Sequence, residues 1–266
     1  MTLPDVQAKK AAAFSALHKG NAFVIPNPWD AGSARVLAGM GFSALATTSS
    51  GFAFTLGRRD GRTTLEEVAA HIQAVDAAVD LPVSADLENG YGADPESAAR
   101  AVLRAAEAGA VGGSIEDFDP DDGIYDIEHA VDRVAAAVQA AHSLGFPFML
   151  TARAENHIRG RDDVRDTIRR LQAFQDAGAD VLYAPGLRNL DDIREVCAST
   201  ARPVNVLALP GMRMRDLADA GVRRVSLGGS LTWVAVTAVM SALSAIRDDG
   251  DFSRLTGRPP VDGWLG

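Results

Sequence analysis

Short apolar or β-branched runs alternate with longer runs of helical periodicity from residue 21 onward, and this alternation constrains the fold most. Glycine, proline, aspartate or asparagine marks almost every changeover. The runs that predict strands are 22–26, 44–48, 82–86, 112–116, 148–152, 180–184, 203–207 and 224–227. The clearest helical runs are 65–79, 95–108, 127–143 and 164–177.

These units predict an α/β fold with a parallel sheet, and eight of them favour closure into a (β/α)8 TIM barrel. Because no composition break divides the chain, we expect one barrel domain over 1–266, with an N-terminal helix at 1–20 and a C-terminal helical tail at 231–266. A doubly wound open sheet is the alternative. It is less favoured because no Gly-x-Gly-x-x-Gly motif follows the first strand.

Charge and composition exclude several classes of function. The chain has 26 lysines and arginines against 35 aspartates and glutamates, a formal net charge of −9. Nucleic acids and anionic membranes attract basic surfaces, so neither is expected as a partner. Lysine occurs only at positions 9, 10 and 19, which excludes a Schiff-base lysine in the main body. The single cysteine, Cys197, excludes an intramolecular disulfide and fits a reducing, cytoplasmic location.

The longest apolar run covers residues 231–246 and is interrupted by threonines and serines. It is shorter than the roughly 18 residues that a membrane-spanning helix needs. We therefore expect a packed helix there. Residues 1–20 are amphipathic and lack a compact apolar core with a cleavage site, so they predict a helix rather than a signal peptide.

Carboxylates gather at the ends of the third and fourth predicted strands. Asp86 and Glu88 are two residues apart, which places them on one side of an extended segment, and Glu116 ends the next strand. Neighbouring strands lie about 4.8 Å apart, so the three could converge on one point. Oxygen-only ligation suits Mg²⁺ or Mn²⁺. The alternative is that each acid caps a helix or pairs with an arginine.

The fifth predicted strand runs into Arg153, Glu155 and His157, which alternate onto one side. A guanidinium beside an acid-rich site can hold a substrate carboxylate through two hydrogen bonds. The alternative is a structural pair between Arg153 and Glu155. His157 is expected to be a polar loop residue rather than a proton carrier.

Two glycine-containing segments are candidate anion sites. Thr48, Ser49, Ser50 and Gly51 follow the second predicted strand and could expose backbone N–H groups to a carboxylate. A Gly-Gly-Ser corner at residues 228–230 precedes the last helix, a position that binds phosphate in many barrels. Either segment could equally be an ordinary tight turn.

Taken together, five motifs resemble the isocitrate lyase/phosphoenolpyruvate mutase superfamily. They are Asn-Pro-Trp-Asp-Ala-Gly-Ser-Ala at 27–34, Leu56-Gly57-x-x-Asp60, Asp86-x-Glu88-Asn89-Gly90-Tyr91-Gly92, Ile115-Glu116-Asp117 and Ala152-Arg153-x-Glu155. The resemblance implies a (β/α)8 barrel whose eighth helix, near 231–246, is exchanged between the subunits of a homodimer or homotetramer. It also implies a Mg²⁺ ion that holds a 2-oxo acid or its enolate.

The same resemblance implies roles for individual residues. Asp86, Glu88 and Glu116 match the acids that hold Mg²⁺ directly or through water. Asp60 matches an acid near the metal and Arg153 an arginine that faces the substrate oxygens; with Glu155 they form the candidate catalytic set. The candidate substrate-binding residues are Thr48, Ser49, Ser50, Gly51, Trp29 and Asn205.

The sequence departs from the family pattern after the fourth predicted strand. The lyases carry Lys-x-Cys-Gly-His there, with an acidic cysteine, and the phosphonopyruvate enzymes carry a Lys-Thr-Asn-Ser type of gate. This chain has Asp-Phe-Asp-Pro-Asp-Asp-Gly-Ile-Tyr at 117–125. Release of CO₂ needs no acid to protonate the departing fragment, so decarboxylation tolerates the missing cysteine better than retro-aldol cleavage does.

The sequence therefore predicts a Mg²⁺-dependent carbon–carbon lyase or decarboxylase acting on a small 2-oxo dicarboxylate through a metal-stabilised enolate. One alternative is an enzyme similar to phosphoenolpyruvate mutase or phosphonopyruvate hydrolase. The other is a non-catalytic protein that binds 2-oxo acids.

Overall fold

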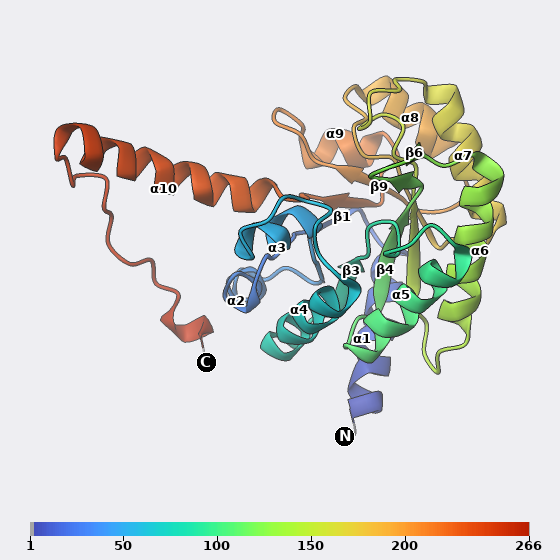
Figure 1. The fold of residues 1–266 in the computed structure, drawn as a ribbon, viewed down its shortest axis with the longest axis horizontal. Coiled ribbons are helices and arrows are strands. Elements are labelled where there is room, and N and C mark those ends of the chain that lie inside the picture. The colour runs from blue at the N-terminus through green and yellow to red at the C-terminus, as the bar shows by residue number, and fades with distance from the viewer. Residues whose placement is uncertain (1–2, 266) are drawn as a thin grey trace.

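The computed structural model describes residues 3–265 and contains a sheet of eight parallel strands curled into a nearly closed barrel (Figure 1). The strands, in their order around the sheet, are β1 (Phe23–Ile25), β10 (Arg224–Ser226), β9 (Val204–Leu207), β8 (Val181–Tyr183), β7 (Met149–Arg153), β4 (Gly112–Glu116), β3 (Val83–Asp86) and β2 (Leu45–Ala46). A two-stranded antiparallel hairpin, β5 (Phe118–Asp119) with β6 (Gly123–Ile124), follows β4. The predicted (β/α)8 barrel is confirmed.

Asn27 helps to close the barrel where β1 and β2 meet. Its Nδ2 donates to Thr47 O at 3.0 Å, and its Oδ1 accepts from the N–H groups of Leu227 and Gly228 at 2.8 and 2.9 Å. The Ala46 N–H also donates to Pro26 O across the same seam at 3.1 Å. One buried amide thus ties together the ends of three strands.

Apart from the last one, the helices surround the sheet and bury apolar side chains against it. Their bounds are α1 (Leu3–Leu17), α2 (Ala31–Gly39), α3 (Ser49–Thr55), α4 (Leu65–Ala78), α5 (Pro95–Glu107), α6 (Ile127–His142), α7 (Val164–Asp176), α8 (Leu190–Ala198), α9 (Met214–Asp219) and α10 (Ser230–Asp249), with a final 3₁₀ turn, η1 (Asp262–Trp264). The predicted helical runs end within a residue of α4, α5, α6 and α7. The hairpin β5–β6 was not predicted, because its two-residue strands are too short to show periodicity.

Helix α5 illustrates why these segments fold as they do. Ala98, Ala101, Val102 and Ala105 recur at helical spacing and are fully buried. Asp94 starts the helix, because its side chain accepts from the Ser97 N–H at 2.7 Å. Small side chains on this face allow α5 to approach β3 and β4 closely, which fixes the position of the two acid-bearing strand ends.

The barrel interior has an apolar lower layer and a polar upper part. Phe14 of α1 is completely buried against Ile25, Val111 and Met149 and plugs the N-terminal end of the barrel. Above it lies Arg224, which is 5% exposed. Most TIM barrels fill this level with branched apolar side chains, so a polar layer here is unusual.

Helix α10 projects away from the barrel (Figure 1). Only Thr232 and Ala245 along it are buried, whereas Val234 is 67% and Met240 62% exposed. The packing that the sequence predicts for this helix is therefore not provided by its own chain. The expectation that the run is too short for a membrane is wrong: α10 has 20 residues, and an 18-residue window within it has a mean hydropathy of 1.4 and is 11% buried. Length and composition alone would allow this helix to span a bilayer.

His18, just after α1, makes the stability of the fold depend on pH. Burial and, second, the positive charge of Arg224, whose Nη1 lies 3.3 Å from Nε2, together lower the pKa of His18 from 6.5 to about 3. Nδ1 lies 2.9 Å from Phe14 O, so the neutral ring that carries its proton on Nδ1 donates there and accepts from Arg224 at Nε2.

Below pH 6.5 the unfolded chain takes up a proton at His18 that the folded chain refuses, so stability falls as pH falls toward 3. We expect the free energy of unfolding to drop by about 1 kcal/mol more between pH 7 and 5.5 in the wild type than in His18→Gln. Urea unfolding at both pH values measures this. Equal pH dependence in the two proteins would contradict the neutral, buried state of His18.

Candidate active site

A pocket opens along the barrel axis, and all eight strands of the large sheet or the residues directly after them contribute to it. Its cavity volume is about 180 Å³. Its lining includes Ile25, Ala46, Asp86, Ser114, Arg153, Tyr183, Asn205, Leu207, Arg224 and Ser226, together with Thr48, Ser49, Ser50 and Asp60 from the loops. A second cavity of about 240 Å³ adjoins it at Asp60, Ser49 and Arg153 and is lined by Glu88, Glu116, Glu155 and Arg159.

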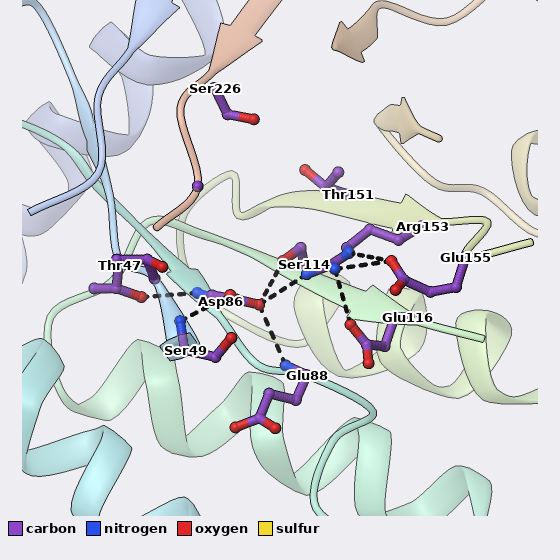
Figure 2. Close-up of polar contacts among 12 residues, drawn as sticks. Thr47, Ser49, Asp86, Glu88, Ser114, Glu116, Thr151, Arg153, Glu155 and Ser226 are labelled. Carbon is purple, nitrogen blue, oxygen red and sulfur yellow. Dashed lines mark hydrogen bonds and ion pairs between the residues drawn. The ribbon is translucent and has the colours of Figure 1, made fainter. Parts of the chain in front are cut away.

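Arg153, at the end of β7, joins three carboxylates (Figure 2). Its Nη1 donates to Asp86 Oδ1 at 3.0 Å, and its Nη2 lies 3.0 Å from Glu116 Oε2 and 2.8 Å from Glu155 Oε1. Burial alone would lower the pKa of Arg153, but the charges of Glu155, Glu116 and Asp86 hold it well above its ordinary value. The parallel register pairs Glu116 directly with Arg153, so the contact follows from the sheet itself.

Arg159 approaches the same acids from the loop after β7. Its Nη2 lies 3.2 Å from Glu155 Oε2 and 3.6 Å from Glu116 Oε1, and its guanidinium stacks 3.6 Å from the centre of the Phe118 ring in β5. Burial and the neighbouring Glu155 charge raise the pKa of Glu116 well above its usual range, against the opposing effect of Arg153. The acids are thus crowded even with two guanidinium groups beside them.

Asp117 holds the acid-bearing segments in place from behind. One of its oxygens accepts from the Glu155 N–H at 2.8 Å, and the other accepts from Arg170 Nη1 of α7 at 2.9 Å. Burial raises the pKa of Asp117 to about 6 in spite of both contacts. Its role is to position Glu155, since it does not line either cavity.

Glu88 turns away from the arginine pair. Its Oε1 accepts from Thr63 Oγ1 at 3.1 Å and from the Tyr91 hydroxyl at 3.3 Å. Burial, then Asp86 and Asp60, raise the pKa of Glu88 to about 7, and burial and Asp86 likewise raise the pKa of Asp60. The backbone of Glu88 has a φ of 48°, a conformation that costs energy in a residue other than glycine and is frequent at functional sites.

The predicted convergence of Asp86, Glu88 and Glu116 on one point is not found. Within residues 3–265, no group of three or more His, Cys, Asp or Glu side chains is arranged to hold a metal ion. Arg153 lies between Asp86 and Glu116, as in the alternative of arginine partners, and Glu88 contacts Thr63 and Tyr91 instead.

The chemistry of the side chains still fits one hard cation. Five carboxylates surround the two cavities, namely Asp60, Asp86, Glu88, Glu116 and Glu155. In the part of the chain that the structure describes, only Arg153 and Arg159 form ion pairs with them. Burial is the main cause of the raised pKa values of Asp60 and Glu88, and the neighbouring negative charges raise them further. Mg²⁺ keeps several waters and needs only one or two direct carboxylate ligands, so the site fits it without a three-acid cage.

The segment predicted as an anion-binding turn is the start of α3. Thr48 caps this helix and accepts from the Gly51 N–H at 3.4 Å, while the Ser49 N–H donates to Asp86 Oδ2 at 3.0 Å. Thr48, Ser49 and Ser50 line the pocket. Gly51 does not line it; a Cβ there would lie 2.7 Å from Thr232 Oγ1 of α10, so Gly51 is needed for packing.

Of the two remaining predicted substrate-binding residues, only Asn205 lines the pocket. Trp29 lies outside the pocket, in an apolar groove of about 270 Å³ that it shares with Phe54 and the first turns of α10. Asn205 of β9 does line the pocket, where it donates to Ser226 Oγ at 2.9 Å and accepts from Arg224 Nε at 2.9 Å. His157 contacts Asp162 at 2.8 Å and lines neither cavity, as expected of a loop residue.

Sequence reasoning missed three residues that border the site. Asn27 lies two residues after the end of β1, and this position at a strand end favours Asn27 over Trp29 as a residue that lines the pocket. Tyr183 lies within β8, and burial raises its pKa to about 12. Arg159 has no signal in the strand pattern, because the loop after β7 brings it to the acids.

Comparisons with known proteins agree with this geometry. The profile of the family "Phosphoenolpyruvate phosphomutase" matches residues 14–247. A crystal structure from Burkholderia cenocepacia J2315, whose own assignment as a lyase or mutase is provisional, superposes with a TM-score of 0.94 at 50% identity over 98% of this chain and 96% of that one.

Related sequences include two that align with most of this chain. An uncharacterized protein of Mycobacterium tuberculosis strain H37Rv is 31% identical over 238 residues, which is 89% of each chain. The oxaloacetate decarboxylase of Rhodopseudomonas palustris strain BisB5 is 30% identical over 262 residues, 93% of this chain and 88% of that enzyme. The chain therefore belongs to the phosphoenolpyruvate phosphomutase family, within the isocitrate lyase/phosphoenolpyruvate mutase superfamily that its motifs resemble.

Proposed function

We propose that this protein is a Mg²⁺-dependent carbon–carbon lyase that decarboxylates a small 2-oxo dicarboxylate similar to oxaloacetate. The observation that carries the proposal is the cluster of five carboxylates and two arginines at the C-terminal mouth of the barrel. A bound Mg²⁺ would polarise the 2-oxo group and stabilise the enolate that remains when the bond to C3 breaks. Asp86, Glu88, Glu116 and Asp60 are the residues that would hold it, directly or through water.

Arg153 is the group in this pocket best placed to orient the substrate. Its guanidinium is fixed by Asp86, Glu116 and Glu155, so little rotational freedom is lost when an oxyanion contacts it. The hydroxyl groups of Ser49 and Ser50 face the same pocket and can donate to a carboxylate. The substrate is therefore held by fixed donors at the point where negative charge develops.

The lining favours decarboxylation over retro-aldol cleavage. Among the described residues that line the pocket there is no histidine, cysteine or lysine. Retro-aldol cleavage needs managed protons, whereas CO₂ departs without being protonated. The 30% identity to an oxaloacetate decarboxylase over 93% of the chain supports the same reaction.

A phosphoryl- or phosphonate-transferring enzyme is the second candidate, because the matching family is described as a phosphomutase. Its predicted phosphate cradle at residues 228–230 is partly occupied, since Asn27 already accepts from the N–H groups of Leu227 and Gly228. This contact weakens the phosphate alternative. A protein that only binds 2-oxo acids is the third candidate.

We expect the purified protein with Mg²⁺ to release pyruvate from oxaloacetate well above the metal-catalysed background. Glu116→Gln should lower kcat/KM at least about a hundredfold, because an acid beside the metal and the arginine pair is lost. Glu195→Gln, at an exposed position on α8, is the matched control and should retain wild-type activity. A coupled assay for pyruvate measures the rate of each of the three proteins. A chelator should abolish the part of the wild-type rate that exceeds the metal-catalysed background.

If the wild type shows no excess over Glu116→Gln, the proposed decarboxylation is wrong. Turnover of phosphonopyruvate without turnover of oxaloacetate would favour the phosphonate enzyme. Binding of 2-oxo acids without turnover of either substrate would favour the binding protein.

We further propose that the exposed face of α10 is covered by a second copy of this chain in a homodimer or homotetramer. The helix extends beyond its own barrel (Figure 1) and exposes Val234, Val239, Met240 and Leu243 by more than half. An apolar groove at its base, lined by Trp29 and residues of the same helix, continues this surface. A patch of this kind on one chain is typical of an obligate subunit contact.

Met240→Glu should convert the oligomer into monomers, because it places a charge in the centre of the proposed contact. Glu195→Gln again serves as the control. Light scattering after size exclusion gives the mass of each protein. A wild type that is monomeric in solution would contradict the subunit contact, and binding of that monomer to lipid vesicles would instead indicate a membrane partner for α10.

A further inference from the structure

Arg224 is a buried guanidinium without an acidic partner. It is 5% exposed, and in the described part of the chain no carboxylate lies within ion-pair distance of it. Its three nitrogens contact only neutral groups: Nε donates to Asn205 Oδ1 at 2.9 Å, Nη2 donates to Thr151 Oγ1 at 2.9 Å, and Nη1 lies 3.3 Å from His18 Nε2. A buried charge is costly unless it is paired, so this arrangement requires an explanation.

The contacts of Arg224 leave part of its capacity unused. A guanidinium has five N–H donors, and the three contacts account for one on each nitrogen. His18 supplies no compensating charge, because an imidazole is either neutral or positive, and burial and Arg224 itself keep this ring neutral. Burial also lowers the pKa of Arg224 to about 10, which still leaves it charged near neutral pH. The barrel interior therefore contains one uncompensated positive charge.

This charge faces the pocket of the proposed active site. Arg224 forms part of the lining of the 180 Å³ cavity, together with Asn205, Ser226 and Tyr183. Thr151, which contacts Arg224, is two residues before Arg153 on β7 and so points to the same side of the sheet, about 7 Å lower. The cavity has the volume of about six water molecules, which is enough for a small anion.

The charges at the two levels of the pocket also differ. Arg153, at the mouth, is already neutralised by Asp86, Glu116 and Glu155. Arg224, at the floor, has only dipolar neighbours. An anion that enters the pocket therefore finds its one unpaired cationic partner at the inner end.

We propose that Arg224, with Asn205, Ser226 and Thr151, forms an anion-binding subsite at the floor of the pocket that takes one carboxylate group or one small inorganic anion. In the first case the anion is the distal carboxylate of a 2-oxo dicarboxylate longer than oxaloacetate, such as 2-oxoglutarate, and this case rests on the proposed function of the pocket as a site for 2-oxo acids. In the second case a monovalent ion such as chloride fills the subsite independently of any reaction. Either anion would pair with the guanidinium of Arg224.

Bromide identifies the subsite without any assumption about activity. We expect crystals of the wild-type protein soaked in sodium bromide to show an anomalous peak within hydrogen-bond distance of the Arg224 guanidinium. In solution, sodium chloride should raise Tm relative to sodium gluconate at equal ionic strength, because chloride is small enough to reach the guanidinium at the floor of the cavity. Arg224→Gln should abolish this difference, and Arg223→Gln, which changes the half-buried neighbouring arginine, should preserve it.

Calorimetry with Mg²⁺ present distinguishes the two occupants. Oxalate carries no distal carboxylate, whereas 2-oxoglutarate does. If a substrate carboxylate occupies the subsite, Arg224→Gln should weaken 2-oxoglutarate binding at least tenfold and leave oxalate binding unchanged, and 2-oxoglutarate should displace bromide. If both ligands bind the variant as they bind the wild type while bromide still marks Arg224, the occupant is an inorganic anion.

The absence of a bromide peak, together with equal binding of both ligands by wild type and Arg224→Gln, would overturn the proposal. Arg224→Lys keeps the charge and should retain most of the chloride effect, which separates loss of charge from loss of packing if Arg224→Gln is unstable. Because bromide binding requires no turnover, a failure of the decarboxylation assay would leave this test intact.

Discussion

The structure of the site depends on one arginine that neutralises acids from separate strand ends. Asp86 of β3, Glu116 of β4 and Glu155 after β7 would repel one another strongly in a buried setting. Arg153 contacts all three, and without it Asp86 would have no ion-pair partner and Arg159 alone would face both Glu116 and Glu155. The parallel register delivers this arrangement directly, since Glu116 pairs with Arg153 and Asp86 pairs with Ser114 across β4.

The same arginine leaves the acids at the other side of the mouth without a cation. Asp60 and Glu88 contact neutral donors, and burial, followed by the negative charge of Asp86, raises the pKa of both. A hard divalent ion would supply the missing charge. The pocket thus combines a fixed guanidinium for substrate oxygens with an acid-rich corner for a metal, while the floor carries Arg224. An elongated dianionic ligand would meet positive charge at both ends.

The fold could be predicted from the sequence because each strand and helix has a local signal. β-branched runs, helical apolar spacing and glycine at the helix ends place the eight strands within a few residues of their observed bounds. Gly178 is an example: it stands at one of the changeovers that glycine marks, and its φ of 104° turns the chain from α7 into β8. Because the active site of a (β/α)8 barrel lies at the C-terminal ends of its strands, the same pattern also places Asp86, Glu116 and Arg153 at one mouth.

The sequence pattern did not predict the directions in which the side chains point. Period-two alternation places Glu88 beside Asp86, but Glu88 adopts a positive φ and turns to Thr63 and Tyr91. Trp29 belongs to a familiar motif, yet the neighbouring Asn27 borders the pocket, because the seam between β1 and β2 needs its amide. The sequence pattern does not indicate that Arg224 is buried, because an arginine at the start of a strand is usually exposed. In this structure it faces the barrel interior.

The most direct test of the account is the binding of a divalent cation at this mouth. Crystals soaked with Mn²⁺ and oxalate should show one anomalous peak at the manganese edge, in contact with Asp60, Asp86, Glu88 or Glu116 or with waters that they hold. Its absence at millimolar Mn²⁺, with Arg153 still spanning both acids, would contradict the account.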